Sequence, residues 1–310
     1  MNVVLVVVGL LGLYLGGDLL VRSASSLARA LGISPMVIGL TVVAFGTSAP
    51  ELAATLVAAF RGAPELALAN VVGSNVANIG LILGLTALAY PLATNASFLR
   101  REVPWMLAAT VLALPLLFDG RLLRWEGLLL WLALAVFLLA AFRSGGAPAI
   151  LVEDVGEAAA ERRRPWRDAI GVAAGVAVLA YGAHALVTGA TALALIWGVP
   201  ERVIGLTLVA LGTSLPELAS SLVAALRRET DIILGNVIGS NLFNLLAVLG
   251  TAAVVHPIEV PPVGLRLDLA IMLGFALAVP PLMLVDRRLG RRRGALLVVA
   301  YVSYVVWLYL

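Results

Sequence analysis

Two glutamates stand inside long apolar stretches of the sequence, each directly after a proline. Glu51 lies in "FGTSAPELA" and Glu217 lies in "LGTSLPELA". If these stretches cross a membrane, each charge costs roughly 2.5–3.5 kcal/mol at the bilayer centre, so the pair needs a large compensating interaction. Either each carboxyl is protonated and hydrogen-bonds a neighbouring helix, or both carboxylates face one cavity and are neutralised by cations.

Neutral oxygen donors accompany both acids. Hydroxyls lie three and four residues before each glutamate, and a second polar cluster follows in "GSNVAN" and "GSNLFN". Residues four apart share one face of a helix, so the first and last polar residues of each cluster point the same way. Such residues can serve helix packing alone, but recurrence of the whole set favours ligation. The candidate side-chain ligands are Glu51, Glu217, Thr47, Ser48, Thr213, Ser214, Ser74, Asn78, Ser240 and Asn244, with Asn75 and Asn241 in the same clusters.

Oxygen donors with two carboxylates and no His or Cys select hard cations. Ca²⁺ takes roughly six to eight oxygens in flexible geometry, and two carboxylates balance one Ca²⁺ or two Na⁺. One pair of acids cannot satisfy both loads at once, and this competition is the physical basis for exchange. An enzyme using Ser48 or Ser214 as a nucleophile would need a base, and neither of the two histidines accompanies these motifs. We therefore expect neither catalysis nor a cofactor.

The two motif sets belong to an internal repeat. Residues 38–84 align with 204–250 at a constant offset of 166 without a gap, and 27 of the 47 positions are identical. The identities include Gly, Thr, Ser, Pro, Glu and Asn, so they indicate duplication and not shared apolar composition. Inverted repeats place their equivalent positions around one axis. We therefore expect Glu51 and Glu217 to meet near the membrane midplane.

A proline and a glycine interrupt the span that carries each acid. Pro50 and Pro216 have no backbone N–H, and each removes a helical hydrogen bond. Gly46 and Gly212 add backbone freedom at the same places. Unpaired backbone inside a bilayer must line a polar cavity or be buried in protein. The pattern predicts two half-helices in each of these spans, with carbonyl oxygens turned inward.

Composition defines the class of protein. Of 310 residues, 62% are hydrophobic and 13% are charged, and apolar runs long enough to cross a bilayer recur along the chain. The first run has neither a basic start nor a cleavage site, so it is interpreted as a span. With no cysteine, there is no disulfide and no thiolate metal site. We predict an all-α membrane protein with ten spans at about 2–21, 33–60, 64–90, 104–118, 125–142, 168–190, 198–226, 232–255, 266–285 and 294–310.

The spans divide into two halves of five. Residues 1–142 form the first repeat, 143–167 a polar linker, and 168–310 the second repeat. Because five is odd, the second half enters the membrane upside down, with discontinuous helices at spans two and seven. With both termini outside, 16 arginines lie on the cytoplasmic side and 5 outside, as the positive-inside rule requires. The linker is then cytoplasmic.

The composition and the placement of charges also predict which partners the chain has. The chain has no room for a soluble domain, so we expect no nucleic-acid binding, and the arginine clusters are explained by topology. We expect the lipid bilayer of the cell membrane as surroundings and no obligatory protein partner. Asp18 is followed by Arg22 four residues later, which predicts an ion pair on one helix face. His184, at the equivalent position of the second half, is expected to pack or to face the interface.

The motif pairs "GTSAPE…GSNVAN" and "GTSLPE…GSNLFN" resemble the repeats of the sodium/calcium exchanger family, within the cation/calcium antiporter superfamily. This resemblance covers the ten-span layout. It implies Na⁺/Ca²⁺ exchange by alternating access at a midplane site, where Glu51 and Glu217 bind Ca²⁺ and share Na⁺. It adds the backbone carbonyls of Ala44 and Ala210 as ligands, and it implies that the first and sixth spans slide over the others.

Two details bear on the choice of coupling ion. Some relatives carry Asp where this chain has Asn244, which by resemblance argues against potassium dependence. Proton-coupled relatives tend to carry Asn where this chain has hydroxyls in "GTS", so the motif favours Na⁺. An H⁺-coupled antiporter for Ca²⁺ or another divalent cation is the close alternative, and a passive channel is a more distant one.

Overall fold

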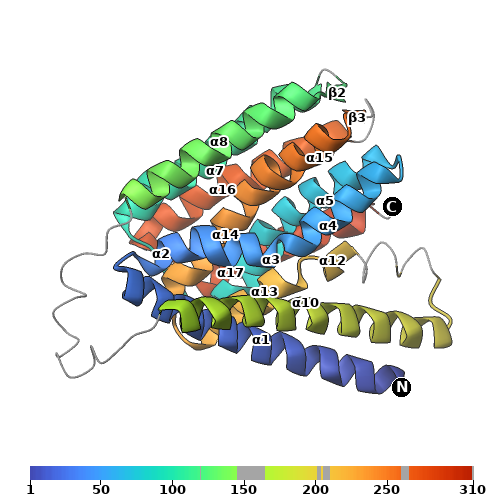
Figure 1. Ribbon diagram of the computed structural model, residues 1–310, viewed down its shortest axis with the longest axis horizontal. Helices are drawn as coiled ribbons and strands as arrows, with labels where there is room; N and C mark the ends of the chain where they lie inside the picture. The colour runs from blue at the N-terminus through green and yellow to red at the C-terminus, as the bar shows by residue number, and fades with distance from the viewer. Residues whose placement is uncertain (119, 145–164, 201–203, 205–209, 260–264, 309–310) are drawn as a thin grey trace.

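The computed structural model describes residues 1–118, 120–144, 165–200, 204, 210–259 and 265–308. Over these ranges the chain is almost entirely helical (Figure 1). Six helices are long and apolar enough to cross a membrane, and a bent pair, Pro35–Thr47 with Ala49–Phe60, makes a seventh. The remaining passes are shorter or carry arginines in their first two turns.

The first half contains five passes in the predicted order. The second and third passes each contain a short π-helical segment, designated η1 and η2. The elements are α1 (Asn2–Leu31); α2 (Pro35–Ile38), η1 (Gly39–Val43), α3 (Ala44–Thr47) and α4 (Ala49–Phe60); α5 (Pro64–Ala77), η2 (Asn78–Leu83) and α6 (Gly84–Ala89); α7 (Ala96–Phe118); and α8 (Arg124–Ser144).

The second half repeats this order, with its second pass described from Ala210 onward. The elements are α10 (Pro165–Ile196); α12 (Ala210–Gly212) and α13 (Leu215–Leu226); α14 (Thr230–Phe243), the π-helical η5 (Asn244–Val248) and α15 (Leu249–Val255); α16 (Leu265–Leu284) with the 3₁₀ turn η6 (Val285–Arg287); and α17 (Arg291–Leu308). The helices thus confirm the predicted ten-pass membrane fold. Most of the linker, at 145–164, lies outside the described residues.

Three of the predicted spans are longer in the structure, and one of them is the fourth, which was expected from 104 but begins at Ala96 in α7. The first was expected to end at residue 21, but α1 continues to Leu31, and the sixth was expected over 168–190, whereas α10 covers Pro165–Ile196. The apolar run of α1 stops at Arg22, yet its buried face continues through Ala24 and Ala28, which keeps the helix intact. Gly32, with φ of 67°, then ends it in a left-handed cap.

Short strands join the two halves at both ends of the bundle. β1 (Leu92–Ala93) pairs antiparallel with β4 (Arg288–Leu289), and β2 (Arg121–Leu122) pairs antiparallel with β3 (Ile258–Glu259). Each sheet combines a loop of the first half with a loop of the second. β1 and β3 occupy equivalent positions of the repeat but lie in different sheets. This exchange is what two inverted halves produce, and it confirms the predicted inversion.

The third and eighth passes form the centre of the bundle. The apolar window of Thr230–Val255 is 100% buried and that of Pro64–Ala89 is 78% buried, against 28% for α1. Outer helices therefore leave apolar faces for lipid. α1 and α10 lie together along one edge (Figure 1). Their glycines allow this approach, because a Cβ on Gly16 would lie 2.7 Å from the backbone nitrogen of Leu179.

Candidate cation-binding site

The second pass bends by 43° between α3 and α4, and the seventh is interrupted between α12 and α13. Ser48 and Ser214 stand at the two breaks with nearly identical backbone angles, φ −80° and ψ 3° for the first and φ −87° and ψ 5° for the second. Each break is followed by a new half-helix with proline at its second position and glutamate at its third. The unpaired N–H groups of a helix start favour a carboxylate there. The expected discontinuous helices are thus present.

The two breaks meet, and each serine bonds the glutamate of the other half. The Ser214 hydroxyl donates to Oε1 of Glu51 at 2.9 Å, and the Ser48 hydroxyl donates to Oε1 of Glu217 at 3.1 Å. Both glutamates are 1% exposed, and each is bonded by the serine at the break of the other half. The expected convergence of the mirrored acids is therefore a feature of the structure.

Unsatisfied polar atoms collect around this pair. In the part of the chain that the structure describes, ten buried side-chain atoms have no hydrogen-bond partner, and six of them come from the predicted ligand set. Each such atom costs about 1–3 kcal/mol if it stays unpaired, so a cluster of them needs water or an ion as partner. The six are Oε2 of Glu51 and of Glu217, Oγ of Ser240, Oδ1 of Asn244, and both Oδ1 and Nδ2 of Asn78.

The two "GSN" clusters divide by role. Ser74 is joined to the site, because the Ser214 hydroxyl also lies 3.3 Å from its Oγ. Ser240 is completely buried without a partner. Asn75 and Asn241, in contrast, donate to the carbonyls of the residues four positions earlier in their own helices, both at 2.8 Å. Their amide nitrogens are thus satisfied within their own helices, and in the described residues neither Oδ1 is among the buried atoms without a partner.

The backbone carbonyls at the two breaks differ in their hydrogen bonds. Thr47 directly precedes Ser48, and Thr213 directly precedes Ser214, at the two breaks. The Ala44 carbonyl accepts the Ser48 N–H at 3.0 Å, whereas the Ser214 N–H bonds Leu211 at 3.2 Å and leaves the Ala210 carbonyl without that donor. The Thr47 hydroxyl also lies 3.4 Å from the Ala44 carbonyl oxygen, but its single proton is shared with the Val43 carbonyl and with Asn236. A carbonyl oxygen has two lone pairs, so the Ala44 oxygen keeps capacity for a cation.

Two asparagines that the sequence analysis did not single out hold the threonines. Asn236 on α14 accepts a hydrogen bond from the Thr47 hydroxyl at 3.2 Å, and its amide donates to Ser221 at 3.0 Å and to Ser220 at 3.3 Å. It thereby connects the two broken passes. Its position is identical in the two halves of the repeat, and that identity was the signal that could have revealed it.

Asn70 on α5 makes the mirrored set of contacts. Its amide donates to Thr55 at 2.8 Å and to the carbonyl of Glu51 at 3.1 Å, and its oxygen accepts from Thr213 at 3.5 Å. Asn236 is fully buried, whereas Asn70 is only half-buried. The two asparagines therefore form a matched pair of unequal tightness.

The π-helical segments were also not predicted. η2 begins at Asn78 and η5 at Asn244, one full repeat apart. A π-helical turn re-aims the side chain at its start and often marks a functional site. These turns begin at Asn78 and Asn244, whose Oδ1 atoms are buried without a partner, and η2 packs on α13 while η5 packs on α4. Composition gives no local signal for such a turn.

α10 covers both breaks. A Cβ on Gly46 would lie 2.5 Å from Cγ2 of Val176, and a Cβ on Gly212 would lie 2.8 Å from Cγ2 of Val187. Both valines belong to α10, so the two motif glycines are required for close approach as well as for backbone freedom. The site is a buried cluster of carboxylate, hydroxyl, amide and carbonyl oxygens under a helix. Such a donor set suits hard cations and offers no soft ligand.

Sequence comparisons identify relatives along the full length. The profile of the family described as sodium/calcium exchanger protein matches residues 1–143 and 168–310. CaxA of Alkalimonas amylolytica is 39% identical over 97% of this chain and 96% of its own. The sodium/calcium exchanger MaX1 of Methanosarcina acetivorans is 32% identical over 99% of this chain and 98% of its own.

A structural comparison gives a matching result. A solved structure of the sodium–calcium exchanger NCX_Mj, soaked with 10 mM Na⁺ and zero Ca²⁺, superposes with a TM-score of 0.86 at 30% identity. The alignment covers 98% of this chain and 98% of that one. The fold of the described part of the chain is therefore that of a solved sodium–calcium exchanger.

Proposed function

The chain belongs to the sodium/calcium exchanger family of multi-pass membrane antiporters, and from this premise we propose that it exchanges Na⁺ for Ca²⁺ at the Glu51–Glu217 site. The observation that carries the proposal is the crossed pair of hydrogen bonds, in which Ser214 serves Glu51 and Ser48 serves Glu217. Each carboxylate keeps its second oxygen unpartnered and buried, as a ligand of a shared cation must.

We assign the ligand set to mirrored positions of the two halves. Glu51 and Glu217 supply charge, and the other members supply neutral oxygens. Asn70 and Asn236 position the threonines and do not themselves ligate. The proposed ligands are Glu51, Glu217, Thr47, Ser48, Thr213, Ser214, Ser74, Ser240, Asn78, Asn244 and the carbonyls of Ala44 and Ala210.

The mechanism follows from charge balance. Two carboxylates are neutralised by one Ca²⁺ or by two Na⁺, so either load removes the repulsion between them. The doubly anionic pair without ions resists rearrangement inside a low-dielectric bundle. α10 covers both breaks through Val176 and Val187, and it is closely packed along α1. The two helices would therefore move together over the remaining helices. Exchange results because loaded sites change sides and bare sites do not.

We propose the orientation that the arginine distribution favours, in the plasma membrane. Both termini lie outside and the 143–167 linker is cytoplasmic, between repeats at 1–142 and 168–310. In this orientation the β1–β4 sheet is cytoplasmic and the β2–β3 sheet is external, since each joins loops on one side of the bundle.

Flux measurements in proteoliposomes test the coupling ion. Purified chain is reconstituted, and ⁴⁵Ca²⁺ uptake is followed while Na⁺, K⁺ and H⁺ gradients are varied one at a time. We expect uptake only with an outward Na⁺ gradient, and loss of it in Glu51→Gln or Glu217→Gln. Uptake driven by a pH gradient without Na⁺ would establish the H⁺-coupled alternative. Uptake that persists without any counter-ion would indicate a channel.

A further inference from the structure

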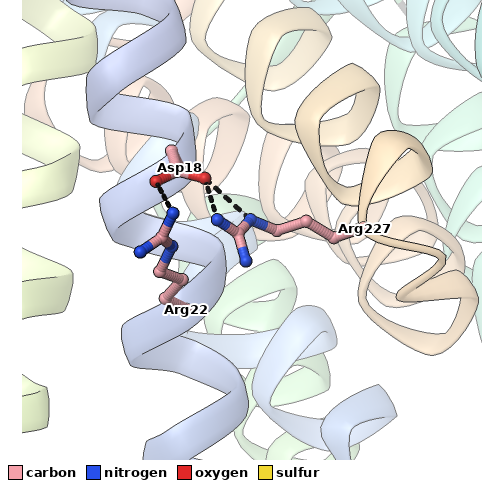
Figure 2. Close-up of polar contacts among 3 residues, drawn as sticks. All are labelled: Asp18, Arg22 and Arg227. Atoms are coloured by element: carbon pink, nitrogen blue, oxygen red, sulfur yellow. Dashed lines mark hydrogen bonds and ion pairs between the residues drawn. The ribbon is translucent and has the colours of Figure 1, made fainter.

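An ion-pair cluster connects α1 to the core of the bundle. Arg227, which caps the C-terminal end of α13, donates through Nε to Oδ1 of Asp18 at 2.7 Å, and its Nη2 contacts the same oxygen. Arg22 reaches the other carboxylate oxygen at 2.8 Å, as expected for residues four apart. Figure 2 shows Asp18 between the two guanidinium groups. The Arg227 contact, 209 positions away in the chain, was not predicted.

This cluster lies where α1 is packed tightly against α13. At Gly17, beside Asp18, a Cβ would lie 3.2 Å from Cγ2 of Val223 on α13. The Asp18 side chain is 19% exposed and that of Arg227 is 31% exposed, so the pair is partly shielded from water. In the proposed orientation this is the cytoplasmic end of α13, and Asp18 opens the cytoplasmic half of α1. α1 is also joined to α10 there, because Ser26 donates to Asp168 at 3.0 Å.

The mirrored positions at the external end carry no such pair. At the repeat offset of 166, the position equivalent to Asp18 is His184, and the position equivalent to Arg227 is Arg61. Neither His184 nor Arg61 offers a carboxylate, and both side chains are exposed. Within the described helices, α1 packs extensively on α13, whereas α10 makes at most marginal contact with the equivalent α4.

The same asymmetry recurs nearer the site. On the cytoplasmic side, Asn236 is fully buried and receives the Thr47 hydroxyl at 3.2 Å. On the external side, Asn70 is half-buried and its link to Thr213 is 3.5 Å. The ion pair of Asp18 and the contacts of Asn236 therefore agree. Both indicate tighter packing on the cytoplasmic side of the site than on the external side.

We propose that Asp18 and Arg227 form a cytoplasmic latch that holds the α1–α10 pair against the core and favours the conformation closed to the cytoplasm. The inference rests on the proposed alternating access, but it adds a one-sided device that the repeat symmetry does not require. To open the cytoplasmic side, α1 must leave α13 and break this ion pair. No equivalent pair from His184 and Arg61 compensates when the external side closes. Resting carriers therefore accumulate with the site accessible from outside.

A thiol-accessibility experiment tests the latch. The chain has no cysteine, so Val223→Cys introduces a single thiol that α1 covers in the closed state. The labelling rate by a membrane-impermeant maleimide is measured in inside-out vesicles. Asp18→Asn and Arg227→Gln are each expected to raise this rate about threefold to tenfold, as loss of one partly shielded ion pair allows. The double variant should be no faster than either single variant, because both remove the same contact.

The controls separate the latch from general loosening. Arg22→Gln removes the exposed partner on α1 itself, and we expect less than a twofold change. Arg227→Lys keeps the charge and should stay near the wild-type rate. His184→Asp offers Arg61 a carboxylate and should raise labelling by stabilising the opposite state. Ala219→Cys on the same face serves as a second reporter.

The outcomes are distinct from those for the proposed function. Equal labelling rates in wild type, Asp18→Asn and Arg227→Gln would overturn the latch, even if all three exchange ions normally. Additive effects in the double variant would also overturn it. Failure of the unmodified chain to exchange Na⁺ for Ca²⁺ in the same vesicles would instead refute the proposed coupling.

Discussion

Replacement of Asn236 by alanine tests whether a residue that does not ligate an ion sets the affinity of the site. The wild-type side chain holds three hydroxyls, those of Thr47, Ser220 and Ser221, at 3.2, 3.3 and 3.0 Å. In Asn236→Ala all three contacts are lost, and the broken passes are no longer bridged at this point.

The expected magnitude follows from what each hydroxyl does next. Ser220 already donates to the carbonyl of Glu217 at 3.1 Å, and Thr47 can turn to the Val43 carbonyl at 3.1 Å. Those groups stay satisfied, so the stability loss is limited. The hydrogen bond that orients the Thr47 oxygen toward an ion is lost in the variant. One net hydrogen bond is worth about 1–1.5 kcal/mol. This corresponds to roughly five- to twelvefold weaker apparent Ca²⁺ affinity.

The assay is Na⁺-driven ⁴⁵Ca²⁺ uptake as a function of external Ca²⁺, with a matched control on the same helix. Asn241 is equally buried but bonds only the Val237 carbonyl, so Asn241→Ala should stay within about twofold of wild type. Asn70→Ala should fall between them, because its link to Thr213 is longer and water can replace it. An Asn241→Ala defect as large as that of Asn236→Ala would refute the positioning role. So would an unchanged Asn236→Ala.

Three further predictions concern the breaks and the ion. Gly46→Ala places a Cβ 2.5 Å from Val176. This overpacking costs about 1–3 kcal/mol and should slow Ca²⁺ uptake. Val176→Ala in the same chain should restore uptake, and a failure to do so would show that α10 does not cover the break. Pro50→Ala returns an N–H to the Gly46 carbonyl and should reduce the 43° bend; an undiminished exchange rate would show that the break is dispensable. Ca²⁺ at 100 times its Kd should stabilise the purified chain by about 2.7 kcal/mol and raise its unfolding temperature, whereas Mg²⁺, which keeps its waters, should not; equal shifts would contradict a selective site.

The acids and hydroxyls of the site were predictable because the same polar residues interrupt an apolar span in each half, at identical spacing. Glu51 and Glu217 are expensive in a bilayer, and the offset of 166 places them together once the repeat is inverted. The crossed bonds from Ser214 and Ser48 follow from the same symmetry. Repetition thus supplied the long-range information that a single sequence usually lacks.

Contacts that break the symmetry were not predictable. Asp18 and Arg227 stand 209 positions apart at places whose mirror images carry different residues or contacts. The length of α1 was underestimated because burial of Ala24 and Ala28, and not hydropathy, carries the helix past Arg22. The π-helical turn at Asn78 depends on packing in the centre of the bundle, for which local composition gives no signal.

Equilibrium Ca²⁺ binding to the purified chain tests the mirrored-glutamate site most directly. Titration calorimetry in detergent is carried out on wild type, Glu51→Gln and Glu217→Gln, with size-exclusion profiles confirming that each variant is folded. We predict that wild type binds Ca²⁺, that Na⁺ displaces it, and that either amide substitution removes measurable binding, since each leaves a single carboxylate to balance two charges. Unchanged Ca²⁺ affinity in both folded variants would contradict the assignment of these two glutamates as the cation site.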